Sequence, residues 1–169
     1  MKHMLVALGV LGFMCAATPV QAQEDLKRLD VWVGDWTWVD MVKDSPTGDE
    51  RKMEGTAQVR RIGDFFYEFR SQWKDADGKD QRWTGIAGYD PVKKSYFNYS
   101  FGSDGWRGTG SLTFGDDAAT TDWAGVTADG EKSPVRCTDM LSEQWTYKCE
   151  RMTDGKWWVS FTGKSTKVK

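Results

Sequence analysis

The side chains available for chemistry in this sequence are carboxylates, tyrosines, lysines and arginines. Its one histidine, His3, lies in a leading segment that we expect to be removed. Without histidine, the remaining chain cannot form a Ser-His-Asp or Cys-His nucleophilic arrangement, a histidine-based zinc site or the proximal ligand of a haem. Acid–base steps by carboxylate, Tyr, Lys or Arg stay open if burial shifts their pKa values.

One acidic segment invites a metal interpretation. Residues 75–80, Asp-Ala-Asp-Gly-Lys-Asp, loosely resemble a calcium loop. In an EF-hand, however, the glycine follows a third ligand and a bidentate Glu comes later, and neither condition is met here. A hairpin turn explains the same residues, so we predict no metal site and no cofactor.

The start of the chain has the three-part pattern of an export signal. Lys2 precedes the uncharged apolar stretch 4–17, and Val20-Gln21-Ala22 offers small residues to a signal peptidase. The apolar stretch is shorter than the roughly 20 residues of a membrane-spanning helix. We therefore expect a signal peptide at 1–22, a single domain at 23–169, a periplasmic or secreted location and no stable membrane insertion.

Composition excludes one class of partner and predicts a covalent link. The chain of 169 residues has a formal net charge of −2, which gives no basic field for nucleic acid. Cys137 and Cys149 remain after the signal, and a pair of cysteines in an exported protein predicts a disulfide. A hairpin centred on Glu143 would place the two cysteines directly opposite each other. Two free thiols are the alternative.

Short aromatic and β-branched segments, separated by Gly and Asp, predict an all-β fold. One or two helical turns are expected at 23–30. In segment 65–74, Phe65, Tyr67, Phe69 and Trp73 share one face, and such alternation indicates an antiparallel sheet with one buried side. The ten expected strands are 32–42, 51–61, 65–74, 81–89, 95–101, 106–114, 120–127, 134–141, 145–152 and 157–166.

The turns predict how these strands are arranged. Asp-Gly pairs, which favour tight hairpins, occur at 77–78, 104–105, 129–130 and 154–155. Every second turn of a meander falls at the same end, so these turns should share one rim, and the N-terminal helical turn could plug the other. We predict a ten-stranded antiparallel up-and-down barrel, because closure removes the exposed sheet edges. A two-sheet sandwich is the alternative.

The first strand carries a family resemblance. The run Leu29…Val33-Gly34-Asp35-Trp36 resembles the Gly-x-Trp opening of the lipocalin-like (calycin) barrels. Together with Gly88-Tyr89-Asp90-Pro91 it is similar to a bacterial family named DUF1579. The resemblance implies that Trp36 packs across the closed end of the barrel, beside a basic residue for which Lys164 is the nearest candidate. It implies no catalytic residues.

Aromatic residues are the strongest functional signal, with 10 Trp, 5 Tyr and 8 Phe. Large side chains fill barrel interiors, but Gly108, Gly110 and Gly125 share faces with tryptophans and could leave space for a ligand, although such glycines can equally mark bends or bulges. The predicted ligand-lining residues are Trp38, Tyr67, Phe69, Trp83, Tyr99, Trp106, Trp123 and Trp157.

We therefore expect a non-catalytic barrel that binds a small apolar or aromatic molecule near the Asp-Gly rim. Two alternatives remain. The first is a surface module that binds glycans or proteins through exposed tryptophan, since adjacent Trp157 and Trp158 must point to opposite faces. The second is a histidine-free lyase or isomerase, which an inward Asp, Glu or Arg beside an inward Tyr would favour.

Overall fold

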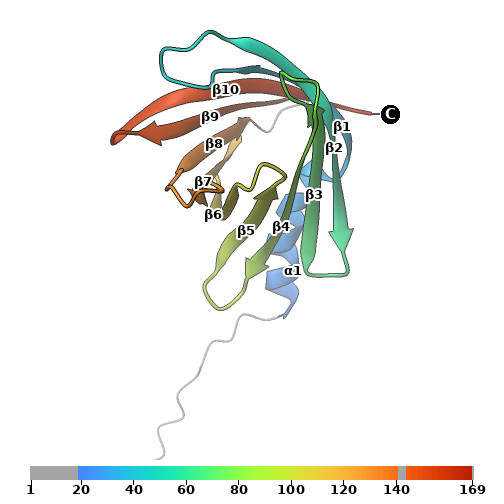
Figure 1. Ribbon diagram of the computed structural model, residues 1–169. Helices are drawn as coiled ribbons and strands as arrows, with labels where there is room; N and C mark the ends of the chain where they lie inside the picture. Colours follow the sequence, from blue (N-terminus) through green and yellow to red (C-terminus); the bar gives the residue numbers. More distant parts are fainter. Residues whose placement is uncertain (1–18, 141–143, 169) are drawn as a thin grey trace, which may run out of the picture.

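The computed structural model describes residues 19–140 and 144–168, and it forms a closed ten-stranded antiparallel barrel (Figure 1). Most of the expected signal segment, residues 1–18, lies outside the described residues. A helix, α1 (Pro19–Lys27), and a short 3-10 helix, η1 (Arg28–Trp32), precede the strands. The strands are β1 Gly34–Val42, β2 Arg51–Ile62, β3 Phe66–Lys74, β4 Asp80–Asp90, β5 Ser95–Gly102, β6 Arg107–Phe114, β7 Ala118–Val126, β8 Val135–Met140, β9 Trp145–Thr153 and β10 Lys156–Lys167.

Each strand pairs with its neighbours in the chain, and β1 pairs with β10 to close the barrel. The register of this last pair runs from Trp36 opposite Lys167 to Val42 opposite Phe161. Closure gives every strand a partner on each side, apart from the ends of β2 and β3, which removes most sites where another chain could add. The predicted barrel is confirmed, and the sandwich alternative is wrong.

The N-terminal helices plug one end of the barrel. Leu26, Leu29 and Trp32 are buried there, and the Tyr96 hydroxyl donates a hydrogen bond of 2.6 Å to the Asp25 carbonyl. In Figure 1, α1 lies at the end of the barrel beside β4. The rim opposite the Asp-Gly turns is therefore the closed one, as the meander predicted.

A polar network fastens this plug to the barrel wall. The Tyr67 hydroxyl donates to the Asp30 carboxylate at 2.5 Å, and the Arg61 guanidinium donates to both groups. Burial, followed by the hydrogen bond with Asp30, raises the pKa of Tyr67 to about 12, so the phenol stays protonated. Tyr67 is fully buried, so the network ties η1 to β2 and β3 from inside.

A β-bulge in β10 sets the direction of the last aromatic side chains. The register with β9 shifts between Val159 and Phe161, where one extra residue, Ser160, is inserted. Phe161 is opposite Cys149 on the inner face, whereas Trp157 and Val159 lie on the outer face. Strict alternation would place all three on one face, and the bulge breaks that alternation.

The Cys137–Cys149 disulfide joins β8 to β9 at directly opposed positions, as the hairpin register predicted. It closes a loop with a sequence separation of 12 residues. Replacing both cysteines with serine is expected to lower the free energy of unfolding by about 3 kcal/mol on the chain-entropy account. Urea denaturation of the double variant measures this change. A loss below about 1 kcal/mol would show that the bridge hardly constrains the unfolded chain.

Candidate functional site

The barrel interior divides into a packed half and a partly open half. Near the plug, buried side chains such as Val59, Ala87 and Leu112 form a continuous core with Trp32 and Leu29. Toward the Asp-Gly rim, the inner face carries Trp158, which is opposite Arg151. It also carries five tryptophans whose rings touch one another, most of them only partly buried: Trp38, Trp73, Trp83, Trp106 and Trp123. We call this open half the lumen.

The lumen tryptophans form two groups of touching rings. Trp123 meets both Trp83 and Trp106 edge to face, with ring centroids 6.3 and 6.0 Å apart. In the second group, from β1 and β3, Trp38 meets Trp73 at 6.2 Å and donates through its indole nitrogen to the Ser71 hydroxyl at 3.0 Å. These contacts hold the rings at fixed angles, so the lumen wall is pre-formed.

Glycines on the inner face make room for these rings. A Cβ added at Gly108 would lie 2.6 Å from the Trp106 ring, and one at Gly110 would lie 2.9 Å from Trp123. Gly125 is likewise covered by the Trp106 ring. The sequence had suggested that these glycines could leave space for a ligand. In the structure, the tryptophan rings fill that space. The glycines let large rings lie flat against the wall.

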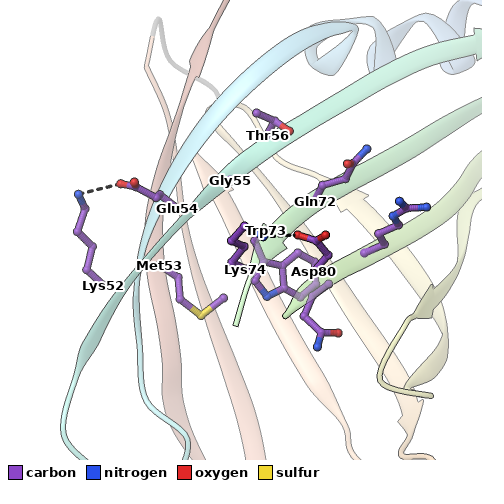
Figure 2. Close-up of a pocket in the computed structure, with 11 residues that line it drawn as sticks. Lys52, Met53, Glu54, Gly55, Thr56, Gln72, Trp73, Lys74 and Asp80 are labelled. Atoms are coloured by element: carbon purple, nitrogen blue, oxygen red, sulfur yellow. Dashed lines mark hydrogen bonds and ion pairs between the residues drawn. The ribbon is translucent and has the colours of Figure 1, made fainter. Parts of the chain in front are cut away.

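An opening in the wall of the barrel lies where β2 and β3 separate. Their pairing ends at Gly55 opposite Trp73, and the two strands then diverge (Figure 2). A pocket of about 640 Å³ lies at this point. Most of its lining residues, such as Lys52 and Lys74, lie on the outer face of the sheet, and inward Met53 and Trp73 join them at the open rim.

A row of polar residues crosses the inner face from this opening toward the packed half, where Asp139 is opposite Ala119 of the core. Asp40 on β1 is opposite Met53, which lines the opening, and opposite Gly163 on β10. Gly163 is in turn opposite Tyr147 on β9, and Tyr147 is opposite Asp139 on β8. Paired positions point to the same side of a sheet, so both carboxyl groups face inward.

Tyr147 reaches across Gly163 to Asp40. Its hydroxyl donates to Asp40 Oδ1 at 2.5 Å, and its ring occupies the space that a Cβ at Gly163 would need. On its other side, the Trp145 indole nitrogen donates to Asp139 Oδ1 at 2.8 Å. We call Asp40, Tyr147 and Asp139 the acidic row.

Burial controls the protonation of this row. It raises the pKa of Asp40 to about 6, opposed by the hydrogen bond from Tyr147, and raises that of Asp139 to about 6, opposed by the bond from Trp145. Burial and the Asp40 charge raise the pKa of the Tyr147 phenol far above its usual value. Tyr147 is thus a permanent proton donor at neutral pH, and the two carboxyls titrate near neutrality.

No cation within the described ranges balances these carboxyls. The groups facing Asp40 from adjoining strands are Met53, Gly163 and Tyr147, and only the tyrosine can titrate. Neither Asp40 nor Asp139 owes any part of its pKa shift to a Lys or Arg. Arg51 on β2 and Arg151 on β9 share the inner face nearer the rim, where Arg51 pairs with Asp44. Within the described ranges, neither carboxyl of the acidic row therefore has an ion-pair partner.

Two indole N–H groups in the interior have no hydrogen-bond acceptor among the described residues, those of Trp32 and Trp106. Trp32 is only 4% exposed, and its ring contacts Phe69, Phe114 and Trp145. It touches inner-face aromatics from three strands, so it lies across the barrel as the floor of the lumen. A buried donor without a partner is unfavourable unless water or a ligand completes it.

Six of the eight predicted ligand-lining residues lie on the inner face. Trp38, Trp83, Trp106 and Trp123 line the lumen, and their binding role stays a prediction. Tyr67 and Phe69 also point inward but belong to the packed half, where they contact Asp30 and Trp32.

The other two predicted residues, Tyr99 and Trp157, lie on the outer face. Tyr99 is 48% exposed, because β5 turns its polar residues Asn98 and Ser100 inward. Trp157 is 37% exposed, because the bulge at Ser160 reverses the alternation of β10. The Arg136 guanidinium lies 5.0 Å from the Trp157 ring centroid.

Trp36 lies at the closed end of the barrel, as the family resemblance implied, but the basic residue beside it is not the expected Lys164. Trp36 is buried, donates to the Trp32 carbonyl at 2.8 Å and packs on Trp145. Lys167 lies over its ring at 5.4 Å. Lys164 is opposite Val39 and points outward, so Lys167 takes the place suggested for it.

The acidic row was missed as a site, although alternation offered a signal for it. Asp40 lies two residues beyond Trp38 and four beyond Trp36, on the same face of one strand. Tyr147 follows Trp145 in the same way. An acidic residue in register with two core tryptophans is the observation that could have found the row.

The acidic segment 75–80 forms a turn. Asp75 accepts hydrogen bonds from the backbone nitrogens of Asp77 and Lys79 and from the Gln81 side chain, which is the chemistry of a hairpin turn. No helix in the described part of the chain is long and apolar enough to span a membrane.

Comparison with known proteins identifies the family. No curated protein matches the sequence. Among solved structures, Rv2717c from M. tuberculosis is similar in fold, with a TM-score of 0.65, 14% identity and coverage of 85% of this chain and 96% of that one. A de novo designed fluorescence-activating β-barrel gives a TM-score of 0.42 at 15% identity, covering 82% of this chain and 95% of its own. The model of the family described as "Protein of unknown function (DUF1579)" matches residues 21–164, and the chain therefore belongs to the DUF1579 family.

Proposed function

We propose that this protein is an exported lipocalin-like barrel that holds a small apolar or aromatic molecule in its lumen without transforming it. The observation that carries the proposal is the set of five touching tryptophans on the inner face, one of which, Trp73, also lines the pocket of about 640 Å³ at the open rim. Small-molecule sites are concave and mostly apolar, with a few fixed polar groups. The lumen has that composition, with the acidic row as its polar part.

The proposed export rests on two features of the chain. The first 22 residues have the pattern of a signal peptide. The disulfide between Cys137 and Cys149 suits an oxidising compartment, the periplasm or the extracellular space. Detection of the protein in a periplasmic extract, with an N-terminus at Gln23, is the expected result. Retention of Met1 in the cytoplasmic fraction would contradict it.

Binding of the neutral fluorescent dye N-phenyl-1-naphthylamine tests the lumen site. Trp73 lines the opening and packs on Trp38. Trp73→Ala is expected to weaken dye binding at least about tenfold, because an aromatic wall is lost. The matched control is Trp157→Ala on the outer face, which should leave binding unchanged. A dye affinity unaffected by Trp73→Ala, or lost with Trp157→Ala, would contradict the proposal and favour a surface site.

A second candidate is acid–base catalysis in the same lumen, favoured by the contact between inward Asp40 and inward Tyr147. A carboxylate with a pKa of about 6 suits a general base, and a protonated phenol suits a general acid. Under this candidate, Asp40→Asn and Tyr147→Phe each abolish turnover of a bound carbonyl compound while binding persists. Recovery of every bound molecule unchanged after prolonged incubation would count against it.

A further inference from the structure

We infer that the ligand of this lumen is a small organic amine, bound as its ammonium ion between the acidic row and the tryptophan walls. This inference rests on the proposed lumen site and names the chemical class of its ligand. Three observations carry it: two inward carboxyls without an ion pair among the described residues, a wall of aromatic rings, and a buried indole N–H that the fold leaves without an acceptor.

The first observation concerns charge. Asp40 and Asp139 lie on opposite sides of Tyr147 on one row of the inner face, and the Tyr147 phenol cannot neutralise them. In the part of the chain that the structure describes, both carboxyls receive hydrogen bonds only from neutral groups, through Oδ1. Buried charges in proteins are normally paired, and an ammonium group would supply the missing pair.

The second observation is the aromatic wall next to that charge. Trp38 lies two residues from Asp40 on the same inner face, and it packs against Trp73 at the opening. The faces of indole rings attract cations, and this attraction grows when water is excluded. An anionic ligand would meet repulsion from the same carboxyls, so the walls and the row select together for a cation with an apolar body.

The third observation is the floor of the lumen. Trp32 is almost completely buried, and its indole N–H has no acceptor among the described residues. Its ring contacts Trp145, the residue that donates to Asp139. The floor beside the acidic row thus contains a donor that the fold itself does not satisfy. An ammonium group cannot accept this hydrogen bond, so a water or an acceptor atom elsewhere on the bound molecule would complete it.

The test compares two matched probes, 2-phenylethylammonium and the neutral 2-phenylethanol, by isothermal titration calorimetry on the intact purified protein at about pH 8. The ammonium ion is expected to bind at least about tenfold more tightly than the alcohol, because only the cation pairs with the carboxylates. Its advantage should shrink at about pH 5, where Asp40 and Asp139, with pKa values of about 6, take up protons. The probe stays protonated over this whole range.

The variants Asp40→Asn and Asp139→Asn show whether these two carboxyls bind the ammonium ion. Each is expected to reduce ammonium affinity about tenfold and to leave the affinity of 2-phenylethanol unchanged, because the amide can still accept the hydrogen bond from Tyr147 or Trp145. The control is Asp77→Asn in the β3–β4 turn at the same rim, which removes the same charge outside the lumen. Affinity unchanged in that control supports the inference.

Three other outcomes overturn the inference. Equal affinities for the two probes would show that the site is apolar and indifferent to charge. An equal loss of ammonium binding in Asp77→Asn would show general attraction to the rim rather than a site at the row. Failure of both probes while N-phenyl-1-naphthylamine still binds removes the amine class only, whereas failure of the dye as well removes the lumen site itself.

Discussion

Replacing Asp139 with asparagine is expected to stabilise the protein at pH 7. The fold holds the Asp139 carboxyl at a pKa of about 6, above its ordinary value of 3.8. Ionising the Asp139 carboxyl is therefore harder in the folded protein than in the unfolded chain. At pH 7 this lowers the free energy of unfolding by at most about 3 kcal/mol. Asparagine removes this penalty and still accepts the hydrogen bond from Trp145. Urea denaturation of the variant and the wild type measures the difference.

The pH dependence of this effect has a definite sign. Because the folded pKa is raised, the folded protein binds more protons than the unfolded chain between about pH 4 and pH 6, and wild-type stability falls as the pH rises through this window. The Asp139→Asn variant should lack that slope, so the two proteins converge below about pH 4. Asp40→Asn should behave in the same way. A variant that is less stable than the wild type at pH 7 would show that the carboxylate supports the fold.

Replacing Leu29 with alanine is expected to release the N-terminal plug. Leu29 is fully buried between η1 and the packed half of the barrel. Removing its side chain leaves a cavity that the surrounding strands cannot fill, and such changes cost about 2–5 kcal/mol. Thermal and urea unfolding of the variant should both show this loss.

The matched control for the plug is Val31→Ala. Val31 belongs to the same short helix but is 46% exposed. Its replacement should change the free energy of unfolding by less than about 0.5 kcal/mol. If Leu29→Ala were equally mild, the plug would be dispensable, and the lumen would have no fixed floor at Trp32.

Stability and binding are opposed in the acidic row. Both carboxyls make the folded protein less stable at neutral pH, yet neither is needed for the hydrogen bonds that an amide could accept. Groups that lower stability without a packing role are typical of functional sites. The stability measurements and the amine-binding measurements should therefore move in opposite directions in the same two variants.

Much of the fold could be predicted because its signals are local. The alternation in 65–74 and the Asp-Gly pairs placed the strands to within about two residues, and the hairpin register placed Cys137 opposite Cys149. The number of strands and the single wet face then favoured closure. The resemblance at Gly34-Asp35-Trp36 indicated the closed end correctly.

The candidate site was harder to predict because its geometry is not local. The bulge at Ser160 reverses the face of Trp157, and no pattern in the preceding residues marks it. The acidic row joins β1, β8 and β9, so its members meet only when the barrel closes. Aromatic content alone favoured Tyr99 as a lining residue, although β5 turns Asn98 inward instead.

Carbon-13 NMR of aspartate side-chain carboxyls, titrated with pH in the free protein and with saturating 2-phenylethylammonium, shows whether the ammonium ion binds at the acidic row. The free protein should show two carboxyls with pKa values of about 6, one missing in Asp40→Asn and the other in Asp139→Asn. Both pKa values should fall when the ammonium ion binds, because the cation favours the ionised form. Two pKa values that stay near 6 with the probe bound, or no raised carboxyl at all, would contradict the account.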